Sequence, residues 1–198
     1  MKTLMKNTLV LAMVFATLIS NAAELTSLYN EEDGKTTLVL ENVSQGDMLL
    51  VKDAYGIILY REAILENGKY NKSFDLTTLP NGSYIFELDK KSDIRVYPFT
   101  VDSKTVTFDK ESLMVIYKPR VKTEDQMIAV NTYNPTKSTY SINIYYGTEH
   151  DSYEKIYSET INDSSIIAKK YTLLKDRTGD YKIEITVNDR TFTSYSSL

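Results

Sequence analysis

Residues 179–187 read Gly-Asp-Tyr-Lys-Ile-Glu-Ile-Thr-Val, and residues 82–88 read Gly-Ser-Tyr-Ile-Phe-Glu-Leu. Each stretch leaves a polar turn, reaches a tyrosine, and then places an apolar residue at every second position. Side chains alternate between the two faces of a β-strand, so this period of two predicts strands with one buried face. We expect both stretches to be late strands of antiparallel β-sheets.

The rest of the chain follows the same pattern. Residues 140–144 alternate in the same way, and no segment after residue 22 carries a helical stripe of apolar residues. Turn-forming residues separate the runs at short intervals, which is typical of an all-β sandwich. These turns include Gln45-Gly46-Asp47, Asn67-Gly68, Pro80-Asn81-Gly82, Asn134-Pro135 and Thr178-Gly179-Asp180.

A repeat divides the chain. When the sequence is shifted by 97 residues, 59–88 aligns with 156–185 without a gap, and eight of the thirty positions are identical. An ungapped match that runs through a turn favours duplication of one structural unit over chance similarity between strands. The identical pairs are Tyr60/Tyr157, Glu62/Glu159, Ile64/Ile161, Lys72/Lys169, Leu76/Leu173, Gly82/Gly179, Tyr84/Tyr181 and Glu87/Glu184.

Both copies contain a Gly-x-Tyr-x-apolar motif after a polar turn, at Gly82 and Tyr84 and again at Gly179 and Tyr181. The motif resembles the tyrosine corner of immunoglobulin-like sandwiches, in which the tyrosine hydroxyl bonds to upstream backbone. The chain has no tryptophan to match the core tryptophan of antibody domains. We therefore expect two tandem immunoglobulin-like antiparallel β-sandwiches of the broader type that includes fibronectin-III domains.

The first residues have the plan of a secretory signal peptide. Lys2 and Lys6 precede the apolar run 9–19, and Ser20-Asn21-Ala22 offers small residues for cleavage. The apolar run is shorter than the roughly 20 residues of a membrane-spanning helix. The sequence predicts a signal peptide at 1–22, a first sandwich at 23–102 and a second at 103–198. The mature chain would be secreted or periplasmic and would have no integral membrane span.

Part of the first copy resembles the C-terminal sorting domains of proteins exported by type IX secretion in Gram-negative bacteria. The resemblance rests on the strand and turn at 53–60, on Phe74-Asp75-Leu76, and on Leu79-Pro80-Asn81-Gly82-Ser83-Tyr84. It covers roughly residues 48–100 and, more weakly, 139–198. It implies a small bacterial sandwich domain and, as an alternative function, a sorting or surface-attachment role.

The composition excludes much chemistry. The chain has no cysteine and one histidine, so it has no disulfides, no thiol nucleophile and no thiolate zinc site. A Ser-His-Asp triad would need His150. A formal net charge of −4 argues against nucleic-acid binding, which requires a basic surface. No nucleophile-elbow or phosphate-loop motif is present, and we expect no cofactor.

Two acidic stretches are weak candidates for a metal. Glu149-His150-Asp151 places the histidine between two carboxylates, but adjacent residues in a strand or turn point in different directions. Glu31-Glu32-Asp33 lacks the alternating ligands of a calcium loop. We interpret both as solvated loop residues, and the sequence leaves weak metal binding near His150 open.

Tyrosine is the unusual feature of the composition, with 16 residues. Outward-facing Tyr145, Tyr153 and Tyr157 could form a binding surface, although tyrosine also fills half-buried strand positions. We expect a non-enzymatic binding or structural module at the bacterial cell envelope or surface, with a protein or glycan partner. A small glycan-active enzyme is the less favoured alternative, because small sandwiches offer little room for a deep cleft.

Overall fold

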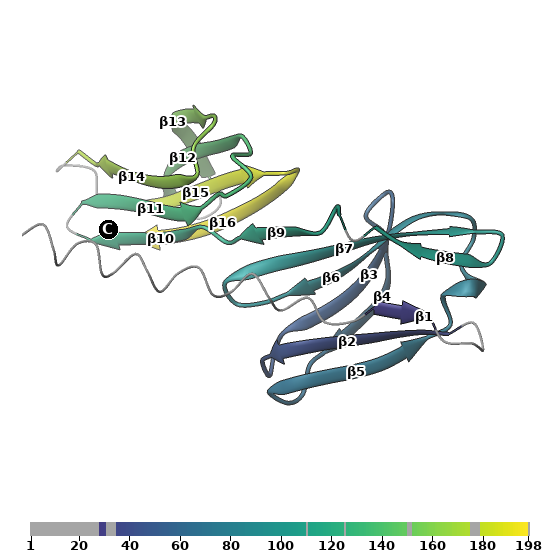
Figure 1. The fold of residues 1–198 in the computed structure, drawn as a ribbon. Helices are drawn as coiled ribbons and strands as arrows, with labels where there is room; N and C mark the ends of the chain where they lie inside the picture. The colour runs from purple at the N-terminus through teal and green to yellow at the C-terminus, as the bar shows by residue number, and fades with distance from the viewer. Residues whose placement is uncertain are drawn as a thin grey trace, which may run out of the picture. The chain divides into compact units, whose positions relative to one another are not determined.

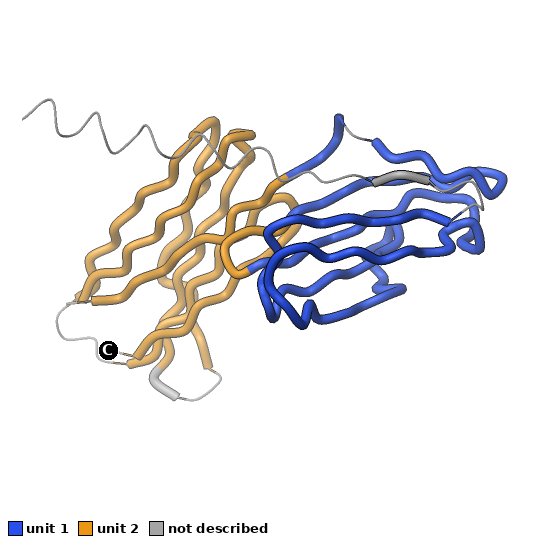
Figure 2. Tube along the Cα trace, turned by 60° about the horizontal axis from the view of Figure 1, so that its bottom comes forward, with its two compact units in different colours: residues 1–90, 95–114 blue, residues 91–94, 115–198 orange. Residues whose placement is uncertain are grey.

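The computed structural model describes residues 28–30, 35–109, 111–124, 126–149, 152–174 and 179–197. Within these residues the regular structure is β-strand, apart from one turn of 3-10 helix, η1 (Leu76–Thr78). The chain divides into two compact units, which Figure 2 shows in blue and orange. The first unit contains residues 1–90 and 95–114, and the second contains 91–94 and 115–198.

The first unit has two antiparallel sheets (Figure 1). One has the order β1-β2-β5, and the other has the order β4-β3-β6-β7-β8. The strands of the first sheet are β1 (Leu28–Asn30), β2 (Thr36–Val43) and β5 (Gly68–Phe74). The strands of the second are β3 (Met48–Asp53), β4 (Ile58–Ala63), β6 (Gly82–Asp89), β7 (Asp93–Asp102) and β8 (Thr105–Phe108).

The second unit repeats this arrangement with sheets β10-β11-β14 and β13-β12-β15-β16, while β9 (Met114–Tyr117) pairs with β7. Its strands are β10 (Arg120–Glu124), β11 (Met127–Tyr133), β12 (Tyr140–Glu149), β13 (Ser152–Ile161), β14 (Ile166–Thr172), β15 (Asp180–Val187) and β16 (Arg190–Ser197). A three-stranded sheet facing one of four or more strands, with this order, is the immunoglobulin-like topology of fibronectin-III domains. The predicted all-β fold with two such sandwiches is confirmed.

Alternating apolar residues supply both cores, as the sequence pattern predicted. In the first unit, Phe86 and Phe99 pack with ring centroids 5.2 Å apart, next to Leu38 and Leu49. In the second unit every odd-numbered residue from Tyr181 to Val187 is buried, and the even-numbered residues are only partly buried. The inward face of β15 is therefore buried and largely apolar, and its outward face is polar and partly exposed.

The boundary between the units differs from the expected one at residue 102. The first sandwich was expected to end at residue 102, but Val101 pairs with Val106 and Asp102 with Thr105 across a hairpin. Ser103 and Lys104 both have positive φ, as the tight two-residue turn of a hairpin requires. β8 therefore completes the first unit, and the division between the units falls after Met114.

Candidate functional site

The outer face of sheet β13-β12-β15-β16 is the most distinctive surface of the second unit. Its strand register places Ser, Thr, Asn, Tyr, Lys and acidic residues on this face, and none of the outward residues is aliphatic. By that register the outward residues are Ser141, Asn143, Tyr145, Gly147, Tyr153, Lys155, Ser158, Thr160, Asp180, Lys182, Glu184, Thr186, Thr191, Thr193, Tyr195 and Ser197. Three tyrosines therefore provide the large apolar surface of an otherwise polar sheet face.

These tyrosines gather around a lysine, and we call Tyr145, Tyr153, Lys155, Lys182 and Tyr195 the Tyr–Lys cluster. The Lys182 ammonium lies 4.3 Å from the ring centroid of Tyr145 and 5.4 Å from that of Tyr153. The Lys155 ammonium lies 5.5 Å from the Tyr145 ring. Tyr153 and Tyr195 lie 6.1 Å apart between centroids. These distances are typical of cation–π and aromatic contacts, which hold the five side chains as one group.

One carboxylate touches the cluster. Glu184 lies 3.0 Å from Lys182, and this hydrogen bond raises the pKa of Lys182. A hydrogen bond from Tyr145, together with that from Lys182, lowers the pKa of Glu184. Lys155 is exposed and makes no ion pair within the described part of the chain. The cluster thus carries two cations, and Glu184 forms an ion pair with Lys182 and interacts electrostatically with Lys155.

Gly147 makes room for the cluster. A Cβ atom at this position would lie 2.6 Å from the Ser152 carbonyl oxygen and 3.2 Å from the nearest atom of the Tyr153 ring. Such contacts are too close for any side chain. A glycine on β12 therefore lets β13 and the Tyr153 ring approach the sheet closely.

Tyr157 does not belong to this surface, although the sequence grouped it with Tyr145 and Tyr153. A β-bulge shifts the register, because Ile144 pairs with Tyr157 whereas Tyr145 pairs with Lys155. The extra residue turns Tyr157 to the face of buried Ile144, where its ring lies 5.1 Å from that of Tyr171 on β14. The bulge interrupts the alternation of faces along β13.

Tyr60, Glu62, Tyr70 and Lys72 form a polar clasp between β4 and β5 in the first unit. The Lys72 ammonium donates to Oε2 of Glu62 at 2.6 Å, and the Tyr70 hydroxyl donates to the same oxygen at 2.7 Å. Tyr60 also donates to Glu62 and accepts from Lys72. The hydrogen bonds from Lys72 and Tyr60 lower the pKa of Glu62 to about 2.

The second unit has an equivalent clasp between β13 and β14. Lys169 donates to Glu159, and the Tyr171 hydroxyl donates to Glu159 at 2.8 Å. The hydrogen bond from Lys169 lowers the pKa of Glu159, and burial followed by the bond to Glu159 raises the pKa of Tyr171. The repeat includes the glutamate and lysine of both clasps as identical residues. Nothing in the sequence indicated that these side chains meet across two sheets.

The two corner tyrosines are buried at the starts of β6 and β15. The Tyr84 hydroxyl donates to the Pro80 carbonyl at 2.7 Å, the bond back to upstream backbone that a tyrosine corner makes. The Tyr181 ring lies 5.2 Å from that of Tyr146. A Cβ atom at Gly179 would lie 2.8 Å from the Tyr146 ring, whereas Gly82 meets nothing closer than 3.7 Å. The backbone just upstream of Gly179 lies outside the described residues.

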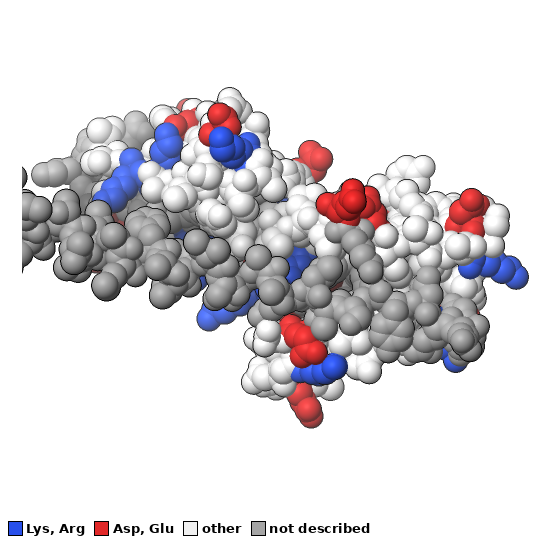
Figure 3. Space-filling view, in the orientation of Figure 1, with Lys and Arg blue, Asp and Glu red and all other residues white. Residues whose placement is uncertain are grey.

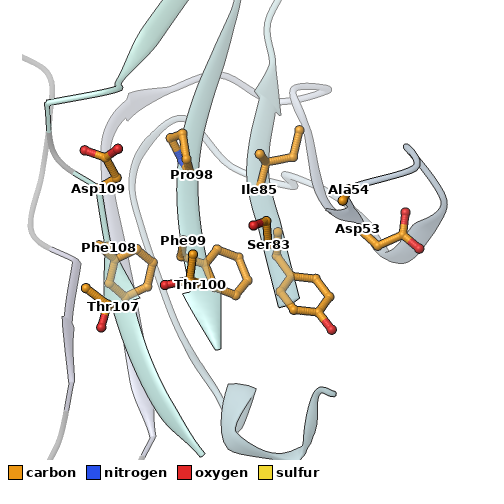
Figure 4. Close-up of a pocket in the computed structure, with 11 residues that line it drawn as sticks. Asp53, Ala54, Ser83, Ile85, Pro98, Phe99, Thr100, Thr107, Phe108 and Asp109 are labelled. Carbon is orange, nitrogen blue, oxygen red and sulfur yellow. The ribbon is translucent and has the colours of Figure 1, made fainter. Parts of the chain in front are cut away.

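A hollow of about 590 Å³ in the first unit is lined by strands β6, β7 and β8 and by the end of β3. It contains two carboxylates, Asp53 and Asp109, which Figure 4 shows at opposite ends of the lining. Asp53 accepts from the backbone of Tyr55 and Ile57 at 2.9 and 2.8 Å. Asp109 accepts from backbone at 3.1 Å, and hydrogen bonds from Ser112 lower its pKa. Both carboxylates thus stabilise turns and do not face each other.

Some sequence candidates fall elsewhere. The signal peptide and Glu31-Glu32-Asp33 lie outside the described residues, as do His150, Asp151 and the side chain of Glu149. Among the described residues no group of three or more His, Asp or Glu could hold a metal ion. That same part of the chain contains no helix long and apolar enough to span a membrane. On the face shown in Figure 3, described Lys, Arg, Asp and Glu side chains lie in small separate groups.

The chain matches no protein-family model and no curated protein. Among solved structures it is similar to the BSP domain of a biofilm associated protein, with 13% identity and a TM-score of 0.27. That alignment covers 82% of this chain but 27% of the other, so the chain spans about a quarter of that structure's length. The chicken interferon gamma receptor alpha chain aligns with 11% identity and a TM-score of 0.29, over 88% of this chain and 95% of that one.

Proposed function

We propose that the protein is a non-enzymatic binding module of the bacterial cell envelope and that the Tyr–Lys cluster is its binding surface. The observation that carries this proposal is the placement of three tyrosines and two lysines on the outer face of one sheet. Tyrosine combines a large contact area with a polar end and loses little conformational entropy on binding. A rigid sheet holds these side chains in place before a partner arrives.

The carboxylates of the first-unit hollow favour binding over hydrolysis. Glycoside hydrolysis needs two carboxyl groups that face each other across the scissile bond. Asp53 and Asp109 instead accept backbone hydrogen bonds in separate turns at opposite ends of the hollow. In this proposal the hollow has no catalytic role.

Export to the envelope rests on the three-part sequence of residues 1–22. Mass spectrometry of the exported protein is expected to find a new amino terminus at Ala23. A protein that keeps Met1 and stays with the membrane fraction would exclude this part of the proposal. The measurement is independent of any binding experiment.

Binding is tested by pull-down of envelope components with the purified exported protein. Tyr195→Ala removes the most exposed ring of the cluster, at 66% exposure, and is expected to reduce capture strongly. Tyr55→Ala is the matched control, because Tyr55 is 90% exposed but lies in the first unit. Equal capture by the wild type and Tyr195→Ala would remove the cluster from the proposed function.

A sorting or surface-attachment role is the second candidate, and the turn at Asp53 favours it. In the resemblance to type IX sorting domains, Asp53 and Gly56 are the fixed residues of a D-x-x-G turn. The Asp53 backbone carbonyl accepts from the Gly56 N–H at 3.0 Å, and Gly56 has φ +81°. If the second copy acts as the sorting signal, a reporter fused to residues 106–198 should be exported and a chain lacking them should stay in the periplasm; a binding module is expected to give neither result.

A further inference from the structure

The chemistry of the outer face of sheet β13-β12-β15-β16 indicates what kind of partner it fits. Stable protein–protein interfaces have a buried apolar centre. Among the described residues the register places no aliphatic side chain on this face, and most of its side chains carry a hydroxyl group. Ser158 already donates to Asn143 at 2.9 Å, and Thr186 lies 2.9 Å from Thr191, so polar side chains on neighbouring strands hydrogen-bond to one another. Such a surface is suited to a partner that is itself rich in hydroxyls.

The tyrosines add the second property that a sugar-binding surface needs. The axial C–H groups of a sugar ring are weakly positive and pack against the negative face of an aromatic ring. Tyr195 on β16 is exposed, and its ring lies 6.1 Å from that of Tyr153 on β13. The open sheet face fits an extended chain of sugars better than an enclosed small molecule, because pocket ligands need a concave site.

The charges select among polysaccharides. Lys155 and Lys182 flank Tyr145; Glu184 forms an ion pair with Lys182 and interacts electrostatically with Lys155, and Asp180 lies on the same face. Lys155 makes no ion pair within the described residues, and its ammonium is exposed beside the rings. A cation held next to a stacking platform favours a ligand whose sugar rings carry carboxylates.

We propose that the Tyr–Lys cluster binds an acidic polysaccharide, one built from sugars that carry carboxylate groups. This inference rests on the proposed function and specifies its ligand. Tyr153 and Tyr195 stack against sugar rings, and Lys155 pairs with a sugar carboxylate. Lys182, held by Glu184 and Tyr145, donates to a hydroxyl or a carboxylate. No covalent step is involved.

The first unit provides an internal comparison. By the repeat and the strand register, Lys52 corresponds to Tyr145, Ile58 to Lys155 and Ile85 to Lys182. Lys52 is paired with Glu87 at 2.8 Å, and both side chains are largely buried. The same sheet position therefore lacks both the tyrosine platform and a free lysine, and the first unit is expected not to bind the polysaccharide.

The test uses the purified exported protein with three defined polymers: polygalacturonate, alginate and neutral dextran. Isothermal titration calorimetry is expected to show binding to at least one acidic polymer, weakening as salt rises, and none to dextran. Tyr195→Ala and Lys155→Gln should each weaken binding about tenfold, the loss expected for one stacking or charged contact. Tyr55→Ala and Lys69→Gln, both in the first unit, should leave affinity unchanged, and thermal melting verifies that every variant is folded.

Three results would overturn the inference, and a fourth would remove the proposed function as well. Equal binding of dextran and the acidic polymers would show that carboxylates are not recognised. Binding of an acidic polymer that Tyr195→Ala and Lys155→Gln leave intact would place the site elsewhere. Failure of both acidic polymers would exclude this ligand class, while the proposed function would survive if an envelope protein were lost from the pull-down on Tyr195→Ala. If Tyr195→Ala binds the polymers and captures envelope proteins as well as the wild type does, both proposals are wrong.

Discussion

Lys72 on β5 lies 2.6 Å from Glu62 on β4, and this ion pair joins the open edges of the two sheets of the first unit. Lys169 and Glu159 form the same pair in the second unit, 97 residues later. The sequence identities that define the repeat therefore include contacts across the edge of each sandwich. They are explained by closure of the fold and need no role in binding.

The first prediction concerns the pH dependence of stability. The pKa of Glu62 is lowered from 4.5 to about 2 by hydrogen bonds from Lys72 and Tyr60. A carboxyl with a lowered pKa contributes stability that is fully present above pH 4.5 and is lost as pH falls toward 2. Glu62→Gln should lower the free energy of unfolding by about 1 kcal/mol at neutral pH and flatten its fall between pH 4.5 and 2. Urea titrations across that range measure both effects.

A matched control for this prediction is Glu41→Gln. Glu41 pairs with Lys69 at 3.3 Å, but both side chains are exposed and both strands belong to one sheet. The variant should change the free energy of unfolding by less than about 0.5 kcal/mol. If the two substitutions had equal effects, an ion pair that joins two sheets would contribute no more to the free energy of unfolding than one within a single sheet.

The second prediction follows from a difference between the clasps. In the first unit the hydroxyl that reaches Glu62 from β5 belongs to Tyr70, and in the second the hydroxyl that reaches Glu159 from β14 belongs to Tyr171. At a shift of 97 residues, Tyr70 corresponds to Ile167, and Tyr171 to Phe74. Tyr70→Phe and Tyr171→Phe should each cost about 1.5 kcal/mol, because each removes a hydrogen bond to a charged group. Guanidinium unfolding measures the cost, and a loss below about 0.3 kcal/mol for both would contradict the clasp.

The fold was largely predictable from the sequence, because apolar residues at every second position mark the buried face of a strand. Tyr181 to Val187 alternates with period two, and the structure buries the predicted side of the strand. The domain boundary was not predictable in the same way. Asp102-Ser103-Lys104 is a polar turn whether it links domains or closes a hairpin, and the pairing of β8 with β7 decides between these possibilities.

The candidate surface was predictable only in part. Tyr145 and Tyr153 were identified from the unusual frequency of tyrosine, but Lys182 and Tyr195 join them through strand pairing across the sheet. Tyr157 was grouped with them because a sequence pattern carries no sign of a β-bulge. Residues far apart in sequence meet through register, and register depends on the whole sandwich.

The third prediction concerns the edge strand β4. Ile58 and Leu59 in this strand are 49% and 46% exposed, and Ile57 just before it is 60% exposed, whereas Glu154 and Lys155 stand at the positions of Ile57 and Ile58 in the second unit. An apolar edge strand promotes pairing with other chains, and charges on an edge prevent it. Ile58→Lys should therefore reduce self-association at high concentration while changing the free energy of unfolding by less than about 0.5 kcal/mol. Light scattering reports the change, with Ile58→Val as the control that should behave like the wild type.

The fourth prediction separates the two corner glycines. A Cβ atom at Gly179 would lie 2.8 Å from the Tyr146 ring and 2.9 Å from the Gly147 carbonyl oxygen, so the ring and the strand would have to move. Gly179→Ala should cost about 1–3 kcal/mol, the range for overpacking in a filled site. Gly82 meets nothing closer than 3.7 Å and has no positive φ, so Gly82→Ala should be neutral or stabilise the protein by about 0.5 kcal/mol.

Urea unfolding compares the two variants. Because Tyr146 and Gly147 adjoin Tyr145, Gly179→Ala should also weaken capture by the Tyr–Lys cluster. If Gly179→Ala and Gly82→Ala were equally stable, the close approach of Tyr146 would not explain the glycine at position 179.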